Sequence, residues 1–240
     1  MTREELQLHE VSRRDLLGGI SIFSSLSDDD LDRLVEITTL KRLPAKQALF
    51  HKGEHAVSLY GIMLGRLKAS AAGADGKEVV FGLMDPGEVI GEIALLDSEP
   101  RSATVVAMED SQLLCLDRRD FLPFLEKHPS VAIELAAVLA LRLRRLSEVM
   151  EDTLFLALPS RLAKKILNLA NAYGREVEDG VVIELKLPQQ ELGELVGTSR
   201  ESINKQLRSW VEEGLVRVER GYITVLRRQR LEELARFLIL

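Results

Sequence analysis

The sequence predicts an α+β protein in which a jelly-roll-like β-barrel (a double-stranded β-helix), a long helix and a winged helix-turn-helix follow one another. Short alternating apolar runs separated by turn residues fill residues 38–118, which is typical of a small barrel or sandwich. Almost thirty residues without Gly or Pro follow Pro129 and indicate one long helix. Residues 187–226 then combine two short helical patterns with a hairpin pattern.

Length and charge agree with this division. A chain of 240 residues can bury a substantial core and form more than one domain, and we expect the boundaries at 1–128, 129–157 and 158–240. The net charge of −6 is unevenly distributed, because residues 1–155 carry −8 and residues 156–240 carry +2. The C-terminal part is therefore compatible with binding an acidic polymer through a local basic face.

Several classes of protein are disfavoured. No run of eighteen apolar residues exists and the first twenty residues lack a secretory h-region, so we expect no membrane span and a cytoplasmic protein. The single cysteine, Cys115, cannot form an internal disulfide or hold an iron-sulfur cluster or zinc alone, and we expect it to be buried. We expect no metal and no catalytic residues, since no Walker loop, HExxH or nucleophile elbow is present. The four histidines lack a haem motif and are expected at the surface: His9, His51, His55 and His128.

The barrel region begins with a helix and continues as strands. Ser27 precedes three aspartates and LDRLVEIT, which predicts an N-capped helix with acidic residues at its positive end. The expected strands are TLKRL, ALFHK, SLYGIML, KEVVFGLM, ATVVAM and QLLCLD. The turn signals between them are 52–53, 74–77, 85–87 and 109–110.

Residues 87–104 interrupt the alternation. A Gly91-Glu92 step that opens a short helical turn offers backbone N–H groups to an anion, and Arg101 and Ser102 can add a guanidinium and a hydroxyl. Glu92 can accept from a sugar hydroxyl and would repel a free phosphate dianion, which favours a ribose phosphate. The alternative is a buried Glu92–Arg101 ion pair that braces the barrel without a ligand.

The long helix carries an apolar stripe at three- and four-residue steps: Leu135, Leu139, Leu143, Leu146, Met150 and Thr153/Leu154. A helix of about 40 Å cannot cover such a stripe with one small barrel, so a partner helix is expected, and its own copy in a homodimer is the natural partner. Packing on the helix's own domain accounts for the first two turns. Residues 154–160 mark a hinge, where Pro159 stops the helix and Ser160 caps the next one, which Gly174 ends.

In the C-terminal domain, two short helical patterns begin at Gln189. Residues 189–196 form a short apolar-faced helix that Gly197 ends, and Thr198 with Glu201 has capping-box spacing for a second helix. The second helix has an inward stripe: Ile203, Leu207, Val211 and Leu215. The runs LVRVE and YITVL flank Arg220-Gly221 and predict the wing hairpin. A last amphipathic helix covers 228–240, and we expect its apolar end, residues 237–240, to dock.

The second helix leaves one polar face: Arg200, Glu201, Asn204, Lys205 and Arg208. Arg and Lys donate to guanine O6 and N7 and Glu accepts from cytosine N4, so these side chains can read major-groove base edges. The alternative is a solvated face of mixed charge in which Glu201 is only the return half of a capping box.

The segment GEIALLDSEPRSAT resembles the phosphate-binding cassette of cyclic-nucleotide-binding domains, and GTSRESINKQL is similar to the recognition helix of one bacterial family. That is the family of the cyclic AMP receptor protein (catabolite activator protein) and the fumarate-nitrate reductase regulator, and the resemblance covers about residues 20–226. It implies a cytoplasmic homodimeric transcription regulator, with RNA polymerase as a possible further partner. The implied effector residues are Gly91, Glu92, Ile93, Ala94, Arg101, Ser102, Ala103 and Ser147. The implied residues for a palindromic operator with TGTGA-like half-sites are Gln189, Thr198, Ser199, Arg200, Glu201, Asn204, Lys205 and Arg208.

One departure concerns the effector. The cyclic AMP receptor protein places a Thr-Ser pair of the dimer helix against the adenine, and an ungapped count from the arginine puts Leu146 and Ser147 there. Loss of the threonine contact weakens the case for cyclic AMP, although it is the effector we predict. Cyclic di-GMP, cyclic GMP and an effector-independent regulator stay open, as does a cyclic-nucleotide-binding scaffold that does not bind DNA.

Overall fold

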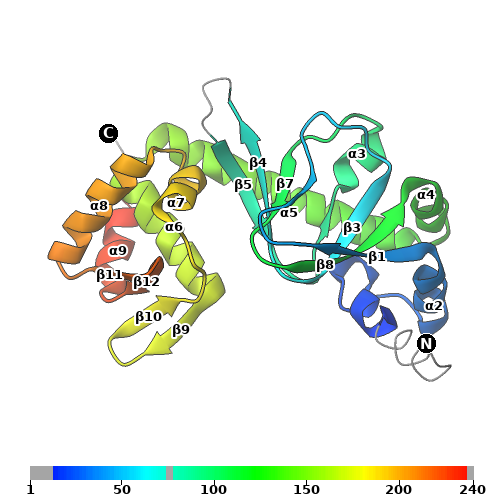
Figure 1. Ribbon diagram of the computed structural model, residues 1–240, viewed down its shortest axis with the longest axis horizontal. Coiled ribbons are helices and arrows are strands. Elements are labelled where there is room, and N and C mark those ends of the chain that lie inside the picture. The colour runs from blue at the N-terminus through cyan, green and yellow to red at the C-terminus, as the bar shows by residue number, and fades with distance from the viewer. Residues whose placement is uncertain (1–12, 74–77, 237–240) are drawn as a thin grey trace. The chain divides into compact units, whose positions relative to one another are not determined.

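The computed structural model describes residues 13–73 and 78–236, which form two compact units along the chain (Figure 1). The first unit contains residues up to Ala71 and Phe81–Leu143, and the second contains Ala72–Val80 and the chain from Arg144 onward. The turn expected at 74–77, His9 and the apolar end 237–240 lie outside the described residues. Each unit is described by itself below.

The first unit is a β-barrel of two four-stranded sheets, with orders β1-β8-β3-β6 and β2-β7-β4-β5. Its strands are β1 Thr38–Leu43, β2 Ala48–Phe50, β3 Ser58–Leu64, β4 Leu67–Ala72, β5 Glu78–Met84, β6 Val89–Ile90, β7 Thr104–Ala107 and β8 Ser111–Asp117. The six expected strands are confirmed. The other two, β4 and β6, were not predicted, because LKASAA lacks β-branched and aromatic residues and a two-residue strand shows no alternation.

Alternation along the strands separates two apolar cores. On β8, Leu113 belongs to the core between the sheets, whereas Leu114 and Leu116 belong to the core beneath the helices. Cys115 packs against the inner core and is partly buried, so the expectation of a buried cysteine is confirmed only in part. It stands opposite Tyr60 on β3.

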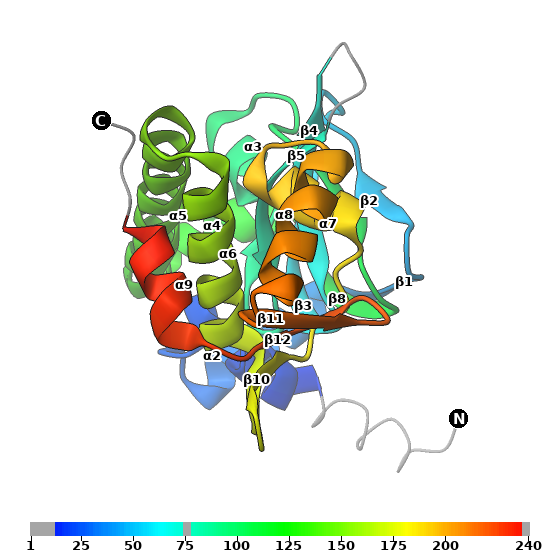
Figure 2. The ribbon, with the colours of Figure 1, turned by 90° about the vertical axis from the view of Figure 1, so that its left-hand side faces the viewer.

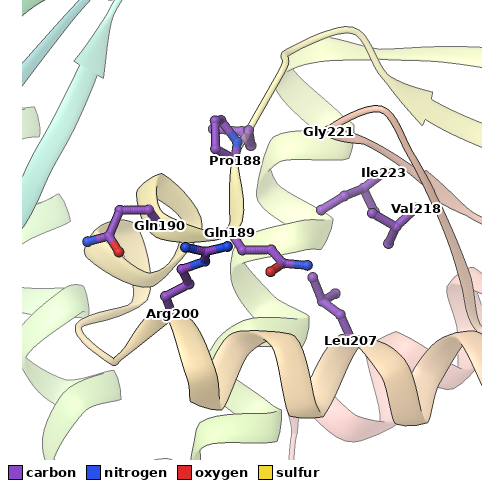
Figure 3. Close-up of a pocket in the computed structure, with 9 residues that line it drawn as sticks. Pro188, Gln189, Gln190, Arg200, Leu207, Val218, Gly221 and Ile223 are labelled. Atoms are coloured by element: carbon purple, nitrogen blue, oxygen red, sulfur yellow. The ribbon is translucent and has the colours of Figure 1, made fainter.

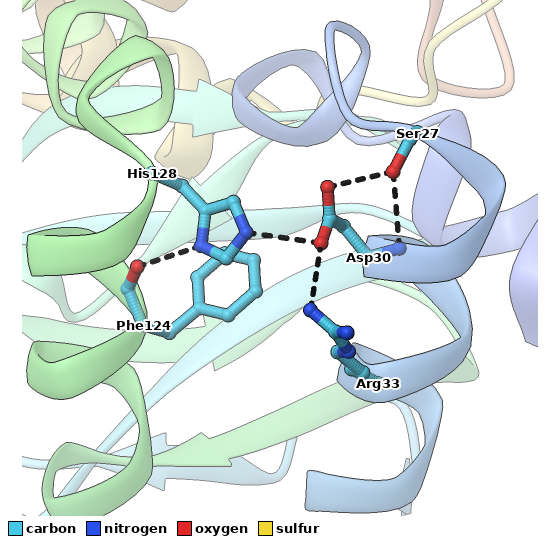
Figure 4. A network of polar contacts seen from close by, with 5 residues as sticks. All are labelled: Ser27, Asp30, Arg33, Phe124 and His128. Atoms are coloured by element: carbon cyan, nitrogen blue, oxygen red, sulfur yellow. Dashed lines mark hydrogen bonds and ion pairs between the residues drawn. The ribbon is translucent and has the colours of Figure 1, made fainter.

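A helical layer covers the outer face of the β1-β8-β3-β6 sheet: the 3₁₀ turn η1 Ser21–Phe23, α2 Asp28–Ile37 and α4 Arg118–Lys127. Ser27 caps α2 as predicted, since its hydroxyl accepts from the Asp30 N–H at 3.3 Å. His128, expected at the surface, is instead packed at the junction of α4 and α5, with its ring stacked on Phe124 at 4.0 Å (Figure 4). Its Nδ1 faces the Phe124 carbonyl at 2.8 Å and its Nε2 faces Asp30 at 3.1 Å.

Helix α5, Pro129–Phe155, is the predicted long helix. At 1.5 Å per residue its 27 residues span about 40 Å. Val131 and Leu135 are buried in the first unit's core, as expected for the first two turns. Beyond them, large apolar side chains are exposed: Leu141, Leu143, Leu146, Met150, Leu154 and Phe155. A single chain therefore leaves most of the apolar stripe uncovered.

The second unit contains α6 Leu158–Tyr173, α7 Gln189–Val196, α8 Arg200–Glu212, α9 Arg228–Ala235 and a four-stranded sheet (Figure 2). The sheet has the order β11-β12-β10-β9, with β9 Gly174–Val177, β10 Gly180–Ile183, β11 Val216–Glu219 and β12 Tyr222–Val225. The predicted Ser160 cap is wrong. Helix α6 begins two residues earlier with Ala157 as its N-cap, and Pro159 is tolerated because the first turn of a helix needs no N–H donor there.

The C-terminal helix α9 lies alongside α6 (Figure 2). Leu231 is fully buried there, and the Arg228 guanidinium donates to Asn171 at 2.7 Å. Among the described residues, no helix is long and apolar enough to cross a membrane, and no group of three His, Cys, Asp or Glu side chains is arranged to hold a metal ion.

Candidate effector pocket and DNA interface

The candidate pocket begins where β6 runs into α3, Glu92–Asp97. Gly91 is the N-cap of α3 and has φ of 88°, a left-handed conformation that favours glycine. A Cβ at this position would lie 2.5 Å from Nη1 of Arg101. Glycine is therefore needed both for the sharp entry into α3, which was predicted, and for the close approach of the Arg101 guanidinium.

Arg101 is 4% exposed and is held by main-chain carbonyls. Its Nη1 donates to the Gly91 carbonyl at 2.8 Å and its Nη2 donates to the Ser58 carbonyl at 2.6 Å, while its buried Nε has no hydrogen-bond partner. Burial lowers the pKa of the Arg101 guanidinium, and the nearby Tyr60 and Glu92 oppose that shift.

Glu92 is 1% exposed, and its partner is Arg142 of α5 rather than Arg101. The Arg142 Nη1 donates to Glu92 Oε1 at 2.5 Å, and its Nη2 donates to the Val89 carbonyl at 2.5 Å. The other carboxylate oxygen, Oε2, is buried without a partner. The proposed alternative of a bracing Glu92–Arg101 pair is therefore not what this chain forms.

Arg142 was missed as a site residue. Arg142 is a basic residue inside an apolar helix, but Arg144 and Arg145 share that pattern and are exposed. Only the fold shows that Arg142 lies against the start of α3.

The remaining predicted effector residues differ in their surroundings. Ala94 is buried, Ile93 and Ser102 are exposed, and Ala103 is partly buried. Ser147 lies on an exposed turn of α5, in the second unit. Among the predicted effector residues, the structure brings Gly91 and Arg101 into direct contact, and Glu92 follows Gly91 in the chain; an effector role for all eight residues stays a prediction.

The helix-turn-helix is built from α7 and α8. Gly197 ends α7 with φ of 73°, as predicted. Gly193 has a role that was not predicted, because a Cβ there would lie 2.8 Å from the Thr198 carbonyl. Ser199, not Thr198, caps α8, and its hydroxyl accepts from the Ser202 N–H at 3.2 Å. The predicted Thr198–Glu201 capping box is therefore wrong, since the helix begins one residue later than that spacing assumes.

Helix α8 buries Ile203, Leu207 and Trp210, whereas Val211 is 45% exposed and contradicts the predicted inward stripe. A strict four-residue repeat drifts around a helix of 3.6 residues per turn, so the third inward position falls on residue 210. The opposite face exposes four of the five predicted reading residues: Arg200, Glu201, Lys205 and Arg208. Asn204 is partly buried, with Gln189 of α7 as its neighbour at 3.5 Å.

The wing forms as predicted, since β11 and β12 pair with Glu219 opposite Tyr222. Its two turn residues, Arg220 and Gly221, have φ of 51° and 89°, the positive values that a two-residue hairpin turn requires. Between the wing, the start of α7 and α8 is a pocket of about 450 Å³. Arg200 and Gln189 lie at this pocket together with apolar side chains of α8 and the wing (Figure 3).

Comparison with known proteins gives a consistent result for both parts of the chain. Residues 40–128 match the cyclic nucleotide-binding domain family, and residues 160–234 match the Crp-like helix-turn-helix domain family. The cyclic AMP receptor protein of Thermus thermophilus is 33% identical over 90% of this chain and 97% of its own length. A CRP-like cAMP-activated global transcriptional regulator of Mycobacterium tuberculosis is 28% identical over 92% of this chain and 99% of its own length.

The solved structure of the cyclic di-GMP-responsive global regulator CLP of Xanthomonas campestris has the same fold, with a TM-score of 0.76 over 83% of this chain and 99% of its own, at 21% identity. The barrel with its Gly91–Arg101 loop, the long helix and the winged helix-turn-helix thus occur in the order seen in these regulators. The chain belongs to the family of cyclic AMP receptor protein and fumarate-nitrate reductase regulators, and it is a transcription regulator with a cyclic nucleotide-binding domain and a DNA-binding helix-turn-helix.

Proposed function

We propose that two copies of this chain bind a palindromic operator and that cyclic AMP, bound at Gly91, Glu92 and Arg101, controls the affinity for DNA. The observation that supports the effector site best is a pair of unsatisfied atoms. Glu92 Oε2 and Arg101 Nε are both buried, and neither has a hydrogen-bond partner within residues 13–73 and 78–236. Buried polar atoms are almost always paired in folded proteins, so such atoms at one loop call for a ligand that completes them.

The two atoms differ in what they require. The Nε–H of Arg101 is a cationic donor and suits a phosphate oxygen, whereas the carboxylate of Glu92 is an acceptor and suits a hydroxyl. A sugar phosphate supplies both groups a few ångströms apart. A free phosphate dianion would meet the negative carboxylate, which disfavours it. The site chemistry therefore supports a nucleotide with a free ribose hydroxyl.

The number of charged groups favours a mononucleotide. A cyclic dinucleotide carries two phosphodiesters, and of the two arginines at this loop Arg101 alone has no carboxylate partner among the described residues, because Arg142 is paired with Glu92. The relatives from Thermus and Mycobacterium are named for cyclic AMP and the Xanthomonas regulator for cyclic di-GMP. We therefore rank cyclic AMP first, with cyclic GMP and cyclic di-GMP as the compounds to compare with it.

The dimer is proposed from α5. Its exposed apolar residues recur along the helix, and Leu143, Met150 and Leu154 are each at least 60% exposed. Burial of one such side chain is worth roughly 1.5–3 kcal/mol, so an exposed stripe of this length is costly unless a partner covers it. A second copy of α5 presents the same stripe in the same order, and a twofold dimer also supplies two recognition helices for a palindrome.

For DNA, the proposal assigns base contacts to Arg200, Glu201 and Lys205 and phosphate contact to Arg208. The first three stand at or near the N-terminal end of α8, which enters the major groove most deeply in a helix-turn-helix. Arg208 lies on the same face, about two turns beyond Arg200. RNA polymerase is a further proposed partner, which membership in this family of regulators suggests.

The test combines calorimetry with DNA binding. Purified protein is titrated with cyclic AMP, cyclic GMP and cyclic di-GMP, and its affinity for operator DNA is measured by fluorescence anisotropy with and without each compound. Arg101→Leu should lose at least a hundredfold in ligand affinity, since a phosphate would be left without its cation. Arg119→Leu is the matched control, because Arg119 is 82% exposed on α4.

Because coupling between two ligands is reciprocal, operator DNA should raise the affinity for the effector by the same factor by which effector raises the affinity for DNA. No heat with any of the three compounds would refute the effector site. Ligand binding without any affinity for DNA fragments that contain TGTGA-like palindromes would favour the scaffold alternative.

A further inference from the structure

Arg101 rests on an aromatic surface inside the barrel. The carbon at the centre of its guanidinium lies 4.1 Å from the ring centre of Phe50 and 5.8 Å from that of Tyr60. The two rings stack with a centre separation of 6.1 Å and an angle of 29° between their planes. Both rings are more than nine-tenths buried, and Lys41 places its ammonium 5.5 Å from the Tyr60 ring.

The cation on this aromatic surface, Arg101, has an unusual environment. Arg101 is buried without a carboxylate within ion-pair distance, since Glu92 is engaged by Arg142. Its bonds to the Gly91 and Ser58 carbonyls use one N–H on each terminal nitrogen, which leaves the Nε–H and the two remaining N–H groups. Besides the longer-range attraction of Glu92, the negative faces of the two aromatic rings stabilise the buried guanidinium.

We propose that Phe50 and Tyr60 form an aromatic platform that positions Arg101 to receive the effector's phosphate. The platform fixes the plane of the guanidinium, the two carbonyls fix its inner edge, and the unused N–H groups are left for an incoming anion. Phe50, with the closer ring, is the main positioning residue. The inference rests on the proposed effector site and adds residues of the barrel wall, on β2 and β3, to it.

The contact between Arg101 and the Phe50 ring sets the size of the expected loss of affinity. A cation over an aromatic face in a desolvated site gains an amount equivalent to roughly ten- to thirtyfold in affinity. Phe50→Leu keeps an apolar side chain of similar reach in the core but removes the π face. Phe50→Tyr keeps the face. Affinity for cyclic AMP should therefore fall by about ten- to thirtyfold in Phe50→Leu and stay within about threefold of the wild type in Phe50→Tyr.

The experiment uses the full-length chain. The matched control is Leu67→Val, which thins the same inner core at β4. Calorimetric titration with cyclic AMP gives the affinities, and thermal melting confirms that each variant is folded. A second measurement needs no ligand: in the ¹⁵N NMR spectrum, ring current from Phe50 should shift the Arg101 Nε–H signal, which is assigned by its loss in Arg101→Lys.

We expect the affinity for cyclic AMP to be weakened in Phe50→Leu and near that of the wild type in Phe50→Tyr and Leu67→Val. The Nε–H signal should move in Phe50→Leu alone. Equal weakening in Phe50→Leu and Leu67→Val would overturn the inference, because it would reflect core stability. Unchanged affinity in Phe50→Leu would overturn it too. If the wild type binds no cyclic nucleotide, the proposed function fails, and an Nε–H signal that is the same in Phe50→Leu as in the wild type would then refute the platform separately.

Discussion

Replacing Arg142 by leucine should destabilise the first unit because it leaves the buried carboxylate of Glu92 without its cation. Glu92 is 1% exposed, and within the described part of the chain its side chain accepts one hydrogen bond, from Arg142 to Oε1 at 2.5 Å. Oε2 is already unpaired, so Arg142→Leu would leave a buried carboxylate with neither oxygen satisfied. Removing one partner of a buried ion pair costs about 3–5 kcal/mol.

The side chain of Arg142 is 24% exposed, and water can reach the space that it vacates. We therefore expect a cost at or just below the lower end of that range, about 2–3 kcal/mol. A second variant, Glu92→Gln, removes the charge while keeping the shape. The double variant Glu92→Gln/Arg142→Leu should recover much of the loss, since no unpaired carboxylate is left at this position.

The measurement is urea unfolding followed by far-ultraviolet circular dichroism for the wild type, both single variants and the double variant. The double-mutant cycle then gives the coupling energy of the pair directly. A coupling below about 0.5 kcal/mol would show that Arg142 and Glu92 do not depend on each other, and the pocket geometry argued above would be wrong.

Three further outcomes are expected. Leu143→Glu should give folded monomers by light scattering, because it places like charges opposite each other in the proposed dimer seam; a stable dimer would refute that seam. Arg200→Ala should cost about 1–3 kcal/mol on the operator and relax specificity at one base pair, whereas Arg208→Ala should weaken operator and random DNA alike, as anisotropy would show. The pKa of Asp30 lies below its usual 3.8, chiefly because of the Ser27 hydroxyl and then His128. A lowered carboxyl pKa stabilises the fold above 3.8 and loses that contribution as pH falls through the folded value, so Asp30→Asn should show a smaller drop in melting temperature between pH 6 and pH 3 than the wild type.

Local patterns were enough to predict the elements whose cause is local. The α2 cap at Ser27, the α7 stop at Gly197 and the wing turn at Arg220-Gly221 all depend on residues within a few positions of one another. The strands with clear alternation were found for the same reason. The β9–β10 hairpin was missed, although Asp179-Gly180 is a turn signal directly before the β-branched run VVI.

The contacts within the candidate effector pocket, by contrast, are not local in the sequence. The loop residues Glu92 and Arg101 were identified from their chemistry, but their partners come from distant segments. Arg142 is fifty residues from Glu92, and Phe50 is about as far from Arg101. No local pattern specifies such contacts, because they depend on strand order and on where α5 crosses the barrel. For this reason the sequence suggested a Glu92–Arg101 pair where the fold instead pairs Glu92 with Arg142.

One turn of α5 connects the two halves of the proposed mechanism. Arg142 is turned toward Glu92 at the start of α3, while Leu143, the next residue, is 65% exposed on the stripe assigned to the dimer seam. Successive side chains on a helix point about 100° apart, so one residue can face the pocket while its neighbour faces a partner helix. An effector that completes Glu92 Oε2 changes the charge environment of the carboxylate that holds Arg142, and it therefore acts on the turn that carries Leu143. Coupling between effector and dimer then needs no long pathway through the barrel, only the rigidity of this one helical turn.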